Sequence, residues 1–179
     1  IVSDVALSPN GKQLAVAVFG SDNGEYISKV YVLNFDSATP TFTAEYKGEF
    51  IYSLQTNANK GFFVIYGGGA DFVHWRKYKT IKFTTENEVR FYRGNSKCSL
   101  IVNTRSADKK DNTLVLVNKR GKQINEIKWN QSITDVALVG NHIVLLCDTN
   151  LYVLDKNGKT VRSGEAGFGG VRVLGIGLE

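Results

Sequence analysis

Short apolar runs alternate with short polar turns along almost the whole chain. The segment "NLYVLDKNGKTV" at 150–161 shows the pattern: a run of apolar and aromatic residues, then Asp-Lys-Asn-Gly-Lys, then a return to Thr-Val. Runs of this kind, rich in Val, Ile, Tyr and Phe and bounded by Asn and Gly, are typical of β-strands joined by tight turns. No amphipathic helical period is sustained, so the pattern predicts an all-β protein with essentially no helix.

The pattern recurs as an internal repeat. "KVYVLNFDS" at 29–37, "TLVLVNKRGK" at 113–122 and "NLYVLDKNGK" at 150–159 each place an apolar strand before Asn or Asp and a turn. "VSDVALSPNGKQLAVAV" at 2–18 and "ITDVALVGNHIVLLC" at 133–147 share Asp-Val-Ala-Leu, an Asn-containing turn and a second apolar strand. The repeating unit therefore has four strands, A to D.

Four such units fill the chain, and a further unit begins near its end. They span residues about 1–49, 50–87, 88–131 and 132–169, and residues 170–179 begin the next unit with "VRVLGIG". The mean spacing between successive A strands is about 42 residues, within the range of β-propeller blades. We therefore expect a β-propeller or partial propeller, with four four-stranded antiparallel blades plus the first strand of a fifth.

Two segments, "VALSPNGKQLAVAV" and "YVLDKNGKTV", resemble the β-propeller superfamily, in particular bacterial families akin to the WD40, YVTN and quinoprotein-type repeats. The chain also resembles an uncharacterised propeller-like family of low-GC Gram-positive bacteria, whose members are usually membrane-anchored with the propeller outside. The second unit departs from the repeat, with "FVHWRKYK" as its strand C. The resemblance implies an extracytoplasmic protein, anchored to the membrane through a missing N-terminal segment.

The arrangement of the blades leaves two alternatives. The chain is either about half of a larger ring or a small four-bladed ring whose last segment packs against the first. We favour the first, because the sequence starts within a strand and contains no Met. A half ring exposes apolar blade faces, which predicts a homodimer through those faces.

Composition adds little to this picture. With 42% hydrophobic and 22% charged residues, the chain has the composition of an ordinary globular protein. Its net charge of +5 is mildly basic and is weak support for an anionic partner. Cys98 and Cys147 lie in apolar runs, so we expect two buried thiols; a disulfide between them is the alternative.

The charged residues sort by turn. In an antiparallel sheet, the A–B and C–D turns lie at one end, and the B–C turns and D–A links lie at the other. The first end carries Lys12, Lys60, Lys77, Lys79, Lys97, Lys119, Arg120, Lys122, Lys156 and Lys159. The second carries Asp22, Glu25, Glu49, Asp71, Glu86, Glu88, Asp108, Asp111 and Glu165, with Lys109 and Lys110 as exceptions. We call the first end the basic rim and hypothesise that it faces an anionic surface such as lipid headgroups or a wall polymer. The residues that would test this are Lys119, Arg120, Lys156 and Lys159. The alternative is that lysine is simply common in solvated turns.

Long B–C loops are expected at 20–28 and 104–112, and binding residues often lie on such loops. Asp22, Asn23 and Glu25 in the first loop could hold a hard cation such as calcium, although they lack the EF-hand pattern. A solvated turn is the favoured alternative.

Aromatic residues gather in the second unit, where most are expected to pack between blades. If Trp75 and Tyr78 are exposed, they would form a patch that binds sugar or peptide. Asp4 and Asp135 occupy the same place in two A strands. They either ring a central channel or accept backbone N–H bonds at strand entries, and we favour the second role.

Searches for catalytic motifs find none. The Gly-rich segments at 66–71 and 167–170 are not followed by a helix, so we interpret them as turns. His74 and His142 fall in different units, and no serine-hydrolase or zinc-protease motif appears. We therefore predict a non-enzymatic binding or assembly scaffold without cofactor or metal, whose partner is a protein or cell-surface polymer. Nucleic acid is not an expected partner, because no recognised module is present. The alternative is part of an enzyme or cofactor-binding propeller whose catalytic groups lie in missing blades.

Overall fold

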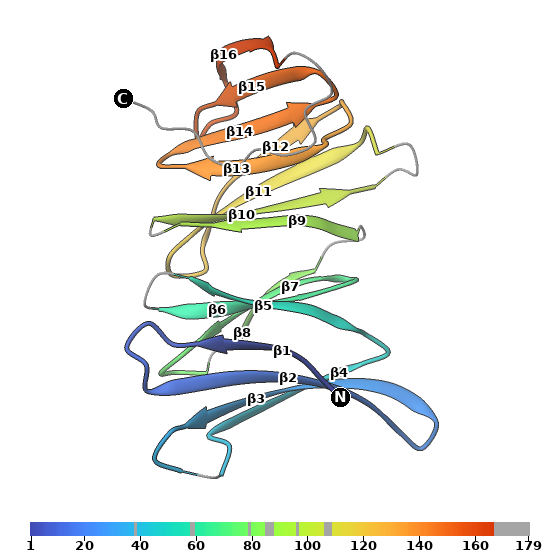
Figure 1. The fold of residues 1–179 in the computed structure, drawn as a ribbon, viewed down its shortest axis with the longest axis vertical. Helices are drawn as coiled ribbons and strands as arrows, with labels where there is room; N and C mark the ends of the chain where they lie inside the picture. Colours follow the sequence, from blue (N-terminus) through green and yellow to red (C-terminus); the bar gives the residue numbers. More distant parts are fainter. Residues whose placement is uncertain are drawn as a thin grey trace. The chain divides into compact units, whose positions relative to one another are not determined.

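The structure, a computed structural model, describes residues 1–37, 39–57, 60–78, 80–84, 88–95, 97–105 and 109–166. Within these ranges, sixteen strands form four separate sheets, each a four-stranded antiparallel meander in chain order (Figure 1). The described residues contain no helix, and hence none long and apolar enough to cross a membrane. The all-β, four-sheet prediction is confirmed.

Each predicted unit contains one sheet. The first sheet comprises β1 (Val2–Leu7), β2 (Gln13–Asp22), β3 (Glu25–Asn34) and β4 (Phe42–Lys47), and the second comprises β5 (Ile51–Asn57), β6 (Gly61–Tyr66), β7 (Gly69–His74) and β8 (Thr80–Thr84). The third comprises β9 (Glu88–Gly94), β10 (Cys98–Thr104), β11 (Asn112–Asn118) and β12 (Gln123–Trp129), and the fourth comprises β13 (Asp135–Val139), β14 (His142–Cys147), β15 (Asn150–Leu154) and β16 (Thr160–Glu165). The further A strand predicted at 171 lies outside the described residues.

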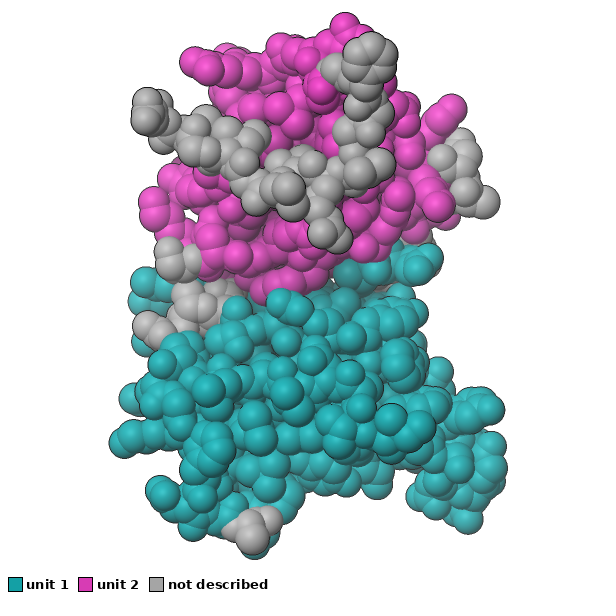
Figure 2. All heavy atoms as spheres, in the orientation of Figure 1, with its two compact units in different colours: residues 1–89, 119–121 teal, residues 90–118, 122–179 magenta. Residues whose placement is uncertain are grey.

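The chain divides into two compact units, coloured separately in Figure 2. Unit 1 comprises residues 1–89 and 119–121 and holds the first two sheets. Unit 2 comprises residues 90–118 and 122–179 and holds most of the third sheet and all of the fourth.

The core of unit 1 lies between its two sheets. Ala15 and Ala17 alternate with less buried residues along β2, so one face of this strand is covered. This face packs into a cluster with the fully buried Phe62 and Val64 of β6. The small alanines leave room for the large residues of β6, which explains why the sheets can approach closely.

The core of unit 2 follows the same plan. Leu100 of β10 and Leu145 of β14, both fully buried, belong to one apolar cluster that also contains Cys98 and Cys147. Both cysteines are free and buried, which confirms the prediction of two buried thiols. Burial raises the pKa of each thiol, so the core favours the neutral form.

The two repeated aspartates join neighbouring A strands. Asp4 of β1 accepts hydrogen bonds from the backbone N–H of Leu54 (2.6 Å) and the hydroxyl of Ser53 (3.0 Å), both on β5. Asp135 of β13 accepts from the guanidinium of Arg93 on β9 at 2.7 Å. The expected backbone bond is thus present at Asp4, and Asp135 forms an ion pair with Arg93.

The β2–β3 connection corrects one prediction. Residues 20–28 were expected to form a long loop, but β2 runs to Asp22 and β3 starts at Glu25, so only Asn23 and Gly24 form the turn. Both turn residues have positive φ, 51° and 84°, the conformation that the right-handed twist of a two-residue hairpin requires. The Asn-Gly pair supplies it at low cost, and the strands therefore continue where a loop was predicted.

Candidate binding site

Four aromatic side chains form a continuous strip on unit 1. Phe19 stacks on Tyr26 with ring centroids 5.6 Å apart, Phe19 meets Phe50 edge-on at 5.1 Å, and Phe50 meets Tyr52 at 5.6 Å. Tyr26 is 67% exposed, Tyr52 51% and Phe50 44%. Large exposed apolar patches are often interaction sites, which makes these side chains a candidate. We call these four residues the aromatic strip.

The extended hairpin positions one half of the strip. On one side Ile1 exchanges backbone hydrogen bonds with Phe19 of β2, and on the other side Gly48 donates to the Tyr26 carbonyl of β3. The residues between Phe19 and Tyr26 therefore form a two-stranded extension (Figure 1). Phe19 and Tyr26 are diagonal neighbours on one face of this extension, because Tyr26 pairs with Ser21. An isolated two-stranded hairpin is marginally stable. The contact between Phe19 and Phe50 therefore helps to hold it.

Acidic groups border the strip. Asp22 and Glu25 pair across the hairpin next to Tyr26, and both are exposed. At the other end, the Glu49 carboxylate accepts a hydrogen bond from the backbone N–H of Gly68 at 3.3 Å. Lys47 ends β4 nearby, while Lys29 is already paired with Glu45 at 2.9 Å. Alternation along the strands puts Asp22 and Glu25 on the face of the hairpin opposite Phe19 and Tyr26, so they are charges at its tip. Glu49 lies near the Tyr52 hydroxyl at the other end of the strip.

Sequence reasoning did not find this strip. Its members lie on three different segments and are scattered between positions 19 and 52. The available signal was Asn23-Gly24, which predicts a hairpin when flanked by strand residues. Continuing the two-residue alternation through that turn would have placed Phe19 and Tyr26 on one face.

The predicted calcium residues form the hairpin tip. Asp22, Asn23 and Glu25 are exposed, which agrees with the favoured solvated turn. The described part of the chain has no group of three or more His, Cys, Asp or Glu side chains that could hold a metal ion.

Trp75 and Tyr78 do not form the patch that was conditional on their exposure. Trp75 is only 3% exposed and packs on Phe62 with ring centroids 4.6 Å apart. Tyr78 is half-buried and stacks on Phe42 at 5.5 Å. Its hydroxyl donates to Thr41 (2.9 Å) and accepts from Gln13 (3.2 Å), so Tyr78 bonds to the first sheet of unit 1.

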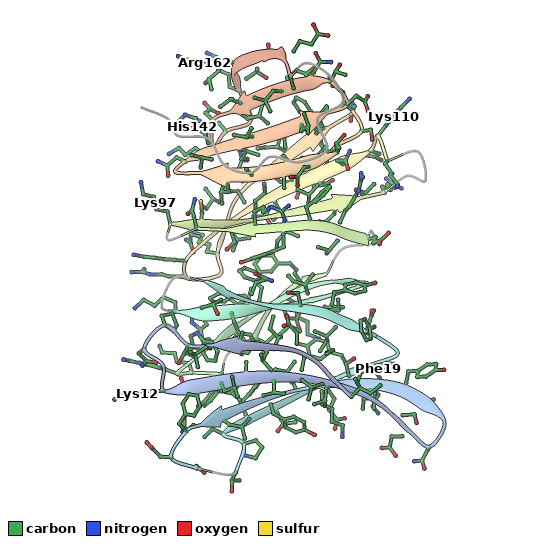
Figure 3. The ribbon with its side chains drawn as sticks, in the orientation of Figure 1. Lys12, Phe19, Lys97, Lys110, His142 and Arg162 are labelled. Atoms are coloured by element: carbon green, nitrogen blue, oxygen red, sulfur yellow. The ribbon has the colours of Figure 1, made fainter. Side chains whose placement is uncertain are left out.

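The four residues chosen to test the basic rim fall in different units. Lys119 and Arg120 belong to unit 1, and Lys156 and Lys159 belong to unit 2, all of them exposed. Within each unit, the labelled residues lie toward one end of the sheets or toward the other. Figure 3 shows Lys12 and Phe19 toward opposite ends of the first sheet, and Lys97 and His142 at the end of unit 2 opposite Lys110.

Asp71 was wrongly assigned to the acidic loops. It lies within β7 and is 2% exposed, and its two carboxylate oxygens accept hydrogen bonds from Tyr46 (3.1 Å) and Tyr66 (3.0 Å). Burial raises the pKa of this carboxyl, and the two hydrogen bonds only partly oppose the rise. Glu86 and Asp108, predicted at the same end, lie outside the described residues.

Solved β-propellers share this fold. The β-propeller domain of the Trilobed protease from Pyrococcus furiosus superposes with a TM-score of 0.61 at 13% identity, covering 89% of this chain and 55% of that one. Sqt1 from Chaetomium thermophilum gives 0.60 at 14% identity (92% and 48%), and the Neurospora crassa Pan2 WD40 domain gives 0.54 at 10% identity (88% and 50%). The chain thus spans about half the length of these propellers.

At such identities the likeness establishes the fold, which is that of β-propeller blades. A protease domain and a WD40 domain are both similar, so the fold alone assigns neither catalysis nor binding. A search of the curated proteins finds no match. The profile described as "Family of unknown function (DUF5711)" matches residues 2–174, and the chain therefore belongs to this family.

Proposed function

We propose that this chain is part of a non-enzymatic binding scaffold whose recognition surface is the aromatic strip. The single observation that carries the proposal is the contact chain from Tyr26 through Phe19 and Phe50 to Tyr52, largely open to solvent, which joins the β2–β3 hairpin to the start of β5. Exposed aromatic side chains contribute much binding energy for little conformational entropy.

The ligand class we propose is an extended, basic segment of a partner protein. Proline-rich, extended segments dock on aromatic-lined surfaces because their backbone is already ordered before binding. The exposed Asp22 and Glu25 at the hairpin tip, and Glu49 near Tyr52, would attract Arg or Lys side chains to this region. An Arg guanidinium can also stack on the exposed Tyr26 ring. The Tyr26 and Tyr52 hydroxyls can donate to peptide carbonyls.

Isothermal calorimetry with a short Pro-Arg repeat peptide tests this proposal. We expect saturable binding that weakens at high salt, no binding of a Pro-Glu repeat, and a loss of at least about tenfold in affinity in Tyr26→Ser and Phe50→Ser. Phe35→Ser is the matched control, because Phe35 is 63% exposed but lies outside the strip. Equal affinity in all three variants would overturn the proposal, as would binding of a neutral glucan oligosaccharide without binding of the peptide.

Location is a second part of the proposal. The resemblance of the repeats to an anchored propeller family supports an extracytoplasmic scaffold. Protease added to intact cells should then cleave the full-length protein. Resistance until the cells are lysed would contradict this location.

Assembly is a third part. Val5 and Leu7 of β1 are 52% and 50% exposed, which supports packing of this apolar surface against a second copy. Sedimentation should show a dimer that Val5→Ser and Leu7→Ser together dissociate.

The charge hypothesis for Lys119 and Arg120 is separate from these proposals. Reversing both charges should lower binding to anionic vesicles at low salt.

A further inference from the structure

A pocket lies at the opposite end of the first sheet from the aromatic strip, beside the β1–β2 turn. Its volume is about 360 Å³, and it is lined by Ser8, Pro9, Asn10, Gln13, Trp75 and Arg76. All six residues belong to unit 1. The volume falls within the range of small-molecule sites.

Internal hydrogen bonds hold one wall of this pocket in place and engage the side-chain oxygens of Ser8 and Asn10. Ser8 Oγ donates to Asn10 Oδ1 at 2.8 Å and accepts from the Gln13 backbone N–H at 2.9 Å. Asn10 Oδ1 also accepts from the Lys12 backbone N–H at 3.2 Å. The amide group that Asn10 has left for a ligand is therefore its NH₂, a donor.

Trp75, which also lines the pocket, has an unused donor. Its side chain is only 3% exposed, and its indole Nε1 has no hydrogen-bond partner among the described residues. Buried donors are nearly always paired, because an unpaired one has lost its water without compensation. An indole N–H can only donate, so the missing partner is an acceptor.

The charge around the pocket selects an anionic acceptor. Arg76 lines the pocket and is exposed, and Lys12 and Lys77 next to the lining residues are exposed as well. None of the six lining residues carries a carboxylate, and Asp36, near Lys12 in the β3–β4 connection, lies outside the lining. A guanidinium binds phosphate or carboxylate oxygens in a two-point geometry.

We propose that this pocket binds an oxyanion, a phosphate or carboxylate group of a small ligand, through the Arg76 guanidinium and the Trp75 indole N–H. The indole nitrogen is buried in this structure, so its bond to the ligand requires a small shift of the side chains that cover it. Asn10 supplies a third donor from the turn. The pocket and its unpaired donor are observations independent of the aromatic strip, so the two proposals stand or fall separately.

Nitrogen-15 NMR of the indole groups tests this proposal directly. The chain has two tryptophans, and Trp129 serves as the internal control because its Nε1 already donates to Cys147 Sγ at 3.3 Å. Titration with inorganic phosphate, glycerol phosphate or acetate, at ionic strength matched with chloride, should move the Trp75 signal downfield and saturably for at least one anion. The phosphate and acetate arms identify which oxyanion is bound. No saturable shift with any of them overturns the proposal.

Two variants separate specific binding from general electrostatics and from misfolding. Trp75→Phe removes the donor and keeps an aromatic ring, but it also removes part of the buried ring volume. We expect a lower melting temperature and, by calorimetry on the folded variant, at least about tenfold weaker binding. Arg76→Gln should weaken binding by a similar factor. Lys60→Gln removes one charge from an exposed turn residue that does not line the pocket, and should have little effect. Equal weakening by Arg76→Gln and Lys60→Gln would overturn the site.

Discussion

Tyr46 on β4 donates its hydroxyl to the buried carboxylate of Asp71 on β7 over 3.1 Å, and this bond joins the two sheets of unit 1. Tyr66 donates to the other carboxylate oxygen over 3.0 Å. Burial and the neighbouring carboxylate raise the pKa of both tyrosines well above the usual range, so both phenols remain donors at any ordinary pH.

Removing one of these donors should destabilise the chain. Tyr46→Phe leaves the Asp71 carboxylate short of one hydrogen bond in a site without water access, at a cost of about 1–3 kcal/mol in the free energy of unfolding. Urea denaturation at neutral pH measures this change. Tyr26→Phe, on an exposed side chain, is the control and should leave the midpoint where it is.

The same carboxyl should make stability depend on pH. Its pKa in the folded state is raised above the ordinary value of 3.8, so the folded chain holds this proton more tightly than the unfolded chain does. The stabilisation is therefore complete below that value and is lost as the pH rises through the folded-state pKa. The unfolding free energy of the wild type minus that of Asp71→Asn should fall as the pH rises from about 3 toward neutrality. A difference that stays flat or increases would contradict this assignment.

Arg93 should not be replaceable by lysine. Its Nη2 donates to Asp135 at 2.7 Å, its Nε donates to the Val136 carbonyl at 2.9 Å, and its Nη1 donates to the Tyr92 carbonyl at 2.9 Å. A lysine ammonium cannot reproduce this fork. We expect Arg93→Lys to cost about 1–2 kcal/mol, below the full value for charged bonds because the arginine is partly exposed.

The comparison for Arg93 is the exposed pair between Lys29 and Glu45 on the first sheet. Glu45→Gln should give no measurable change in thermal or urea denaturation. If Arg93→Lys and Glu45→Gln change the stability equally, the burial of Asp135 does not make its ion pair more stabilising than the exposed one.

The two thiols should react only when unit 2 opens. Cys98 and Cys147 are 5% and 2% exposed, and burial raises their pKa, so little thiolate is available to attack a disulfide reagent. With Ellman's reagent at neutral pH, we expect negligible labelling of the native chain and two thiols per chain in denaturant. Labelling of the native chain at the rate of a free peptide thiol would show that this core is not closed.

The strands were predictable because their signals are local. The alternation of apolar residues and the Asn-Gly turns placed β1, β10 and the turn before β16 within a residue or two of their positions. The error at residues 20–28 arose because the polar residues there suggested a loop, whereas the pairing of β2 with β3 continues to Asp22. Polar side chains are compatible with a solvated strand, so polarity alone did not locate the turn.

The binding features were less predictable, because each depends on burial. The sequence left open whether Trp75 is exposed, and the structure shows that packing buries it against Phe62. Asp71 looked like a loop charge, but it lies inside β7, where its carboxylate accepts hydrogen bonds from two tyrosines. Both residues have ordinary sequence neighbours, and their surroundings come from segments that are distant along the chain.

The amino-acid sequence alone was sufficient for the repeat, the four meandering sheets and the buried thiols, because strand periodicity and turn chemistry act over a few residues. Only the tertiary structure showed which side chains meet across sheets: the aromatic strip from Tyr26 to Tyr52, the carboxylate between Tyr46 and Tyr66, and the unpaired indole of Trp75. The reason is that alternation specifies which face a residue occupies, whereas the packing of one sheet on the next decides whether that face is covered and by what.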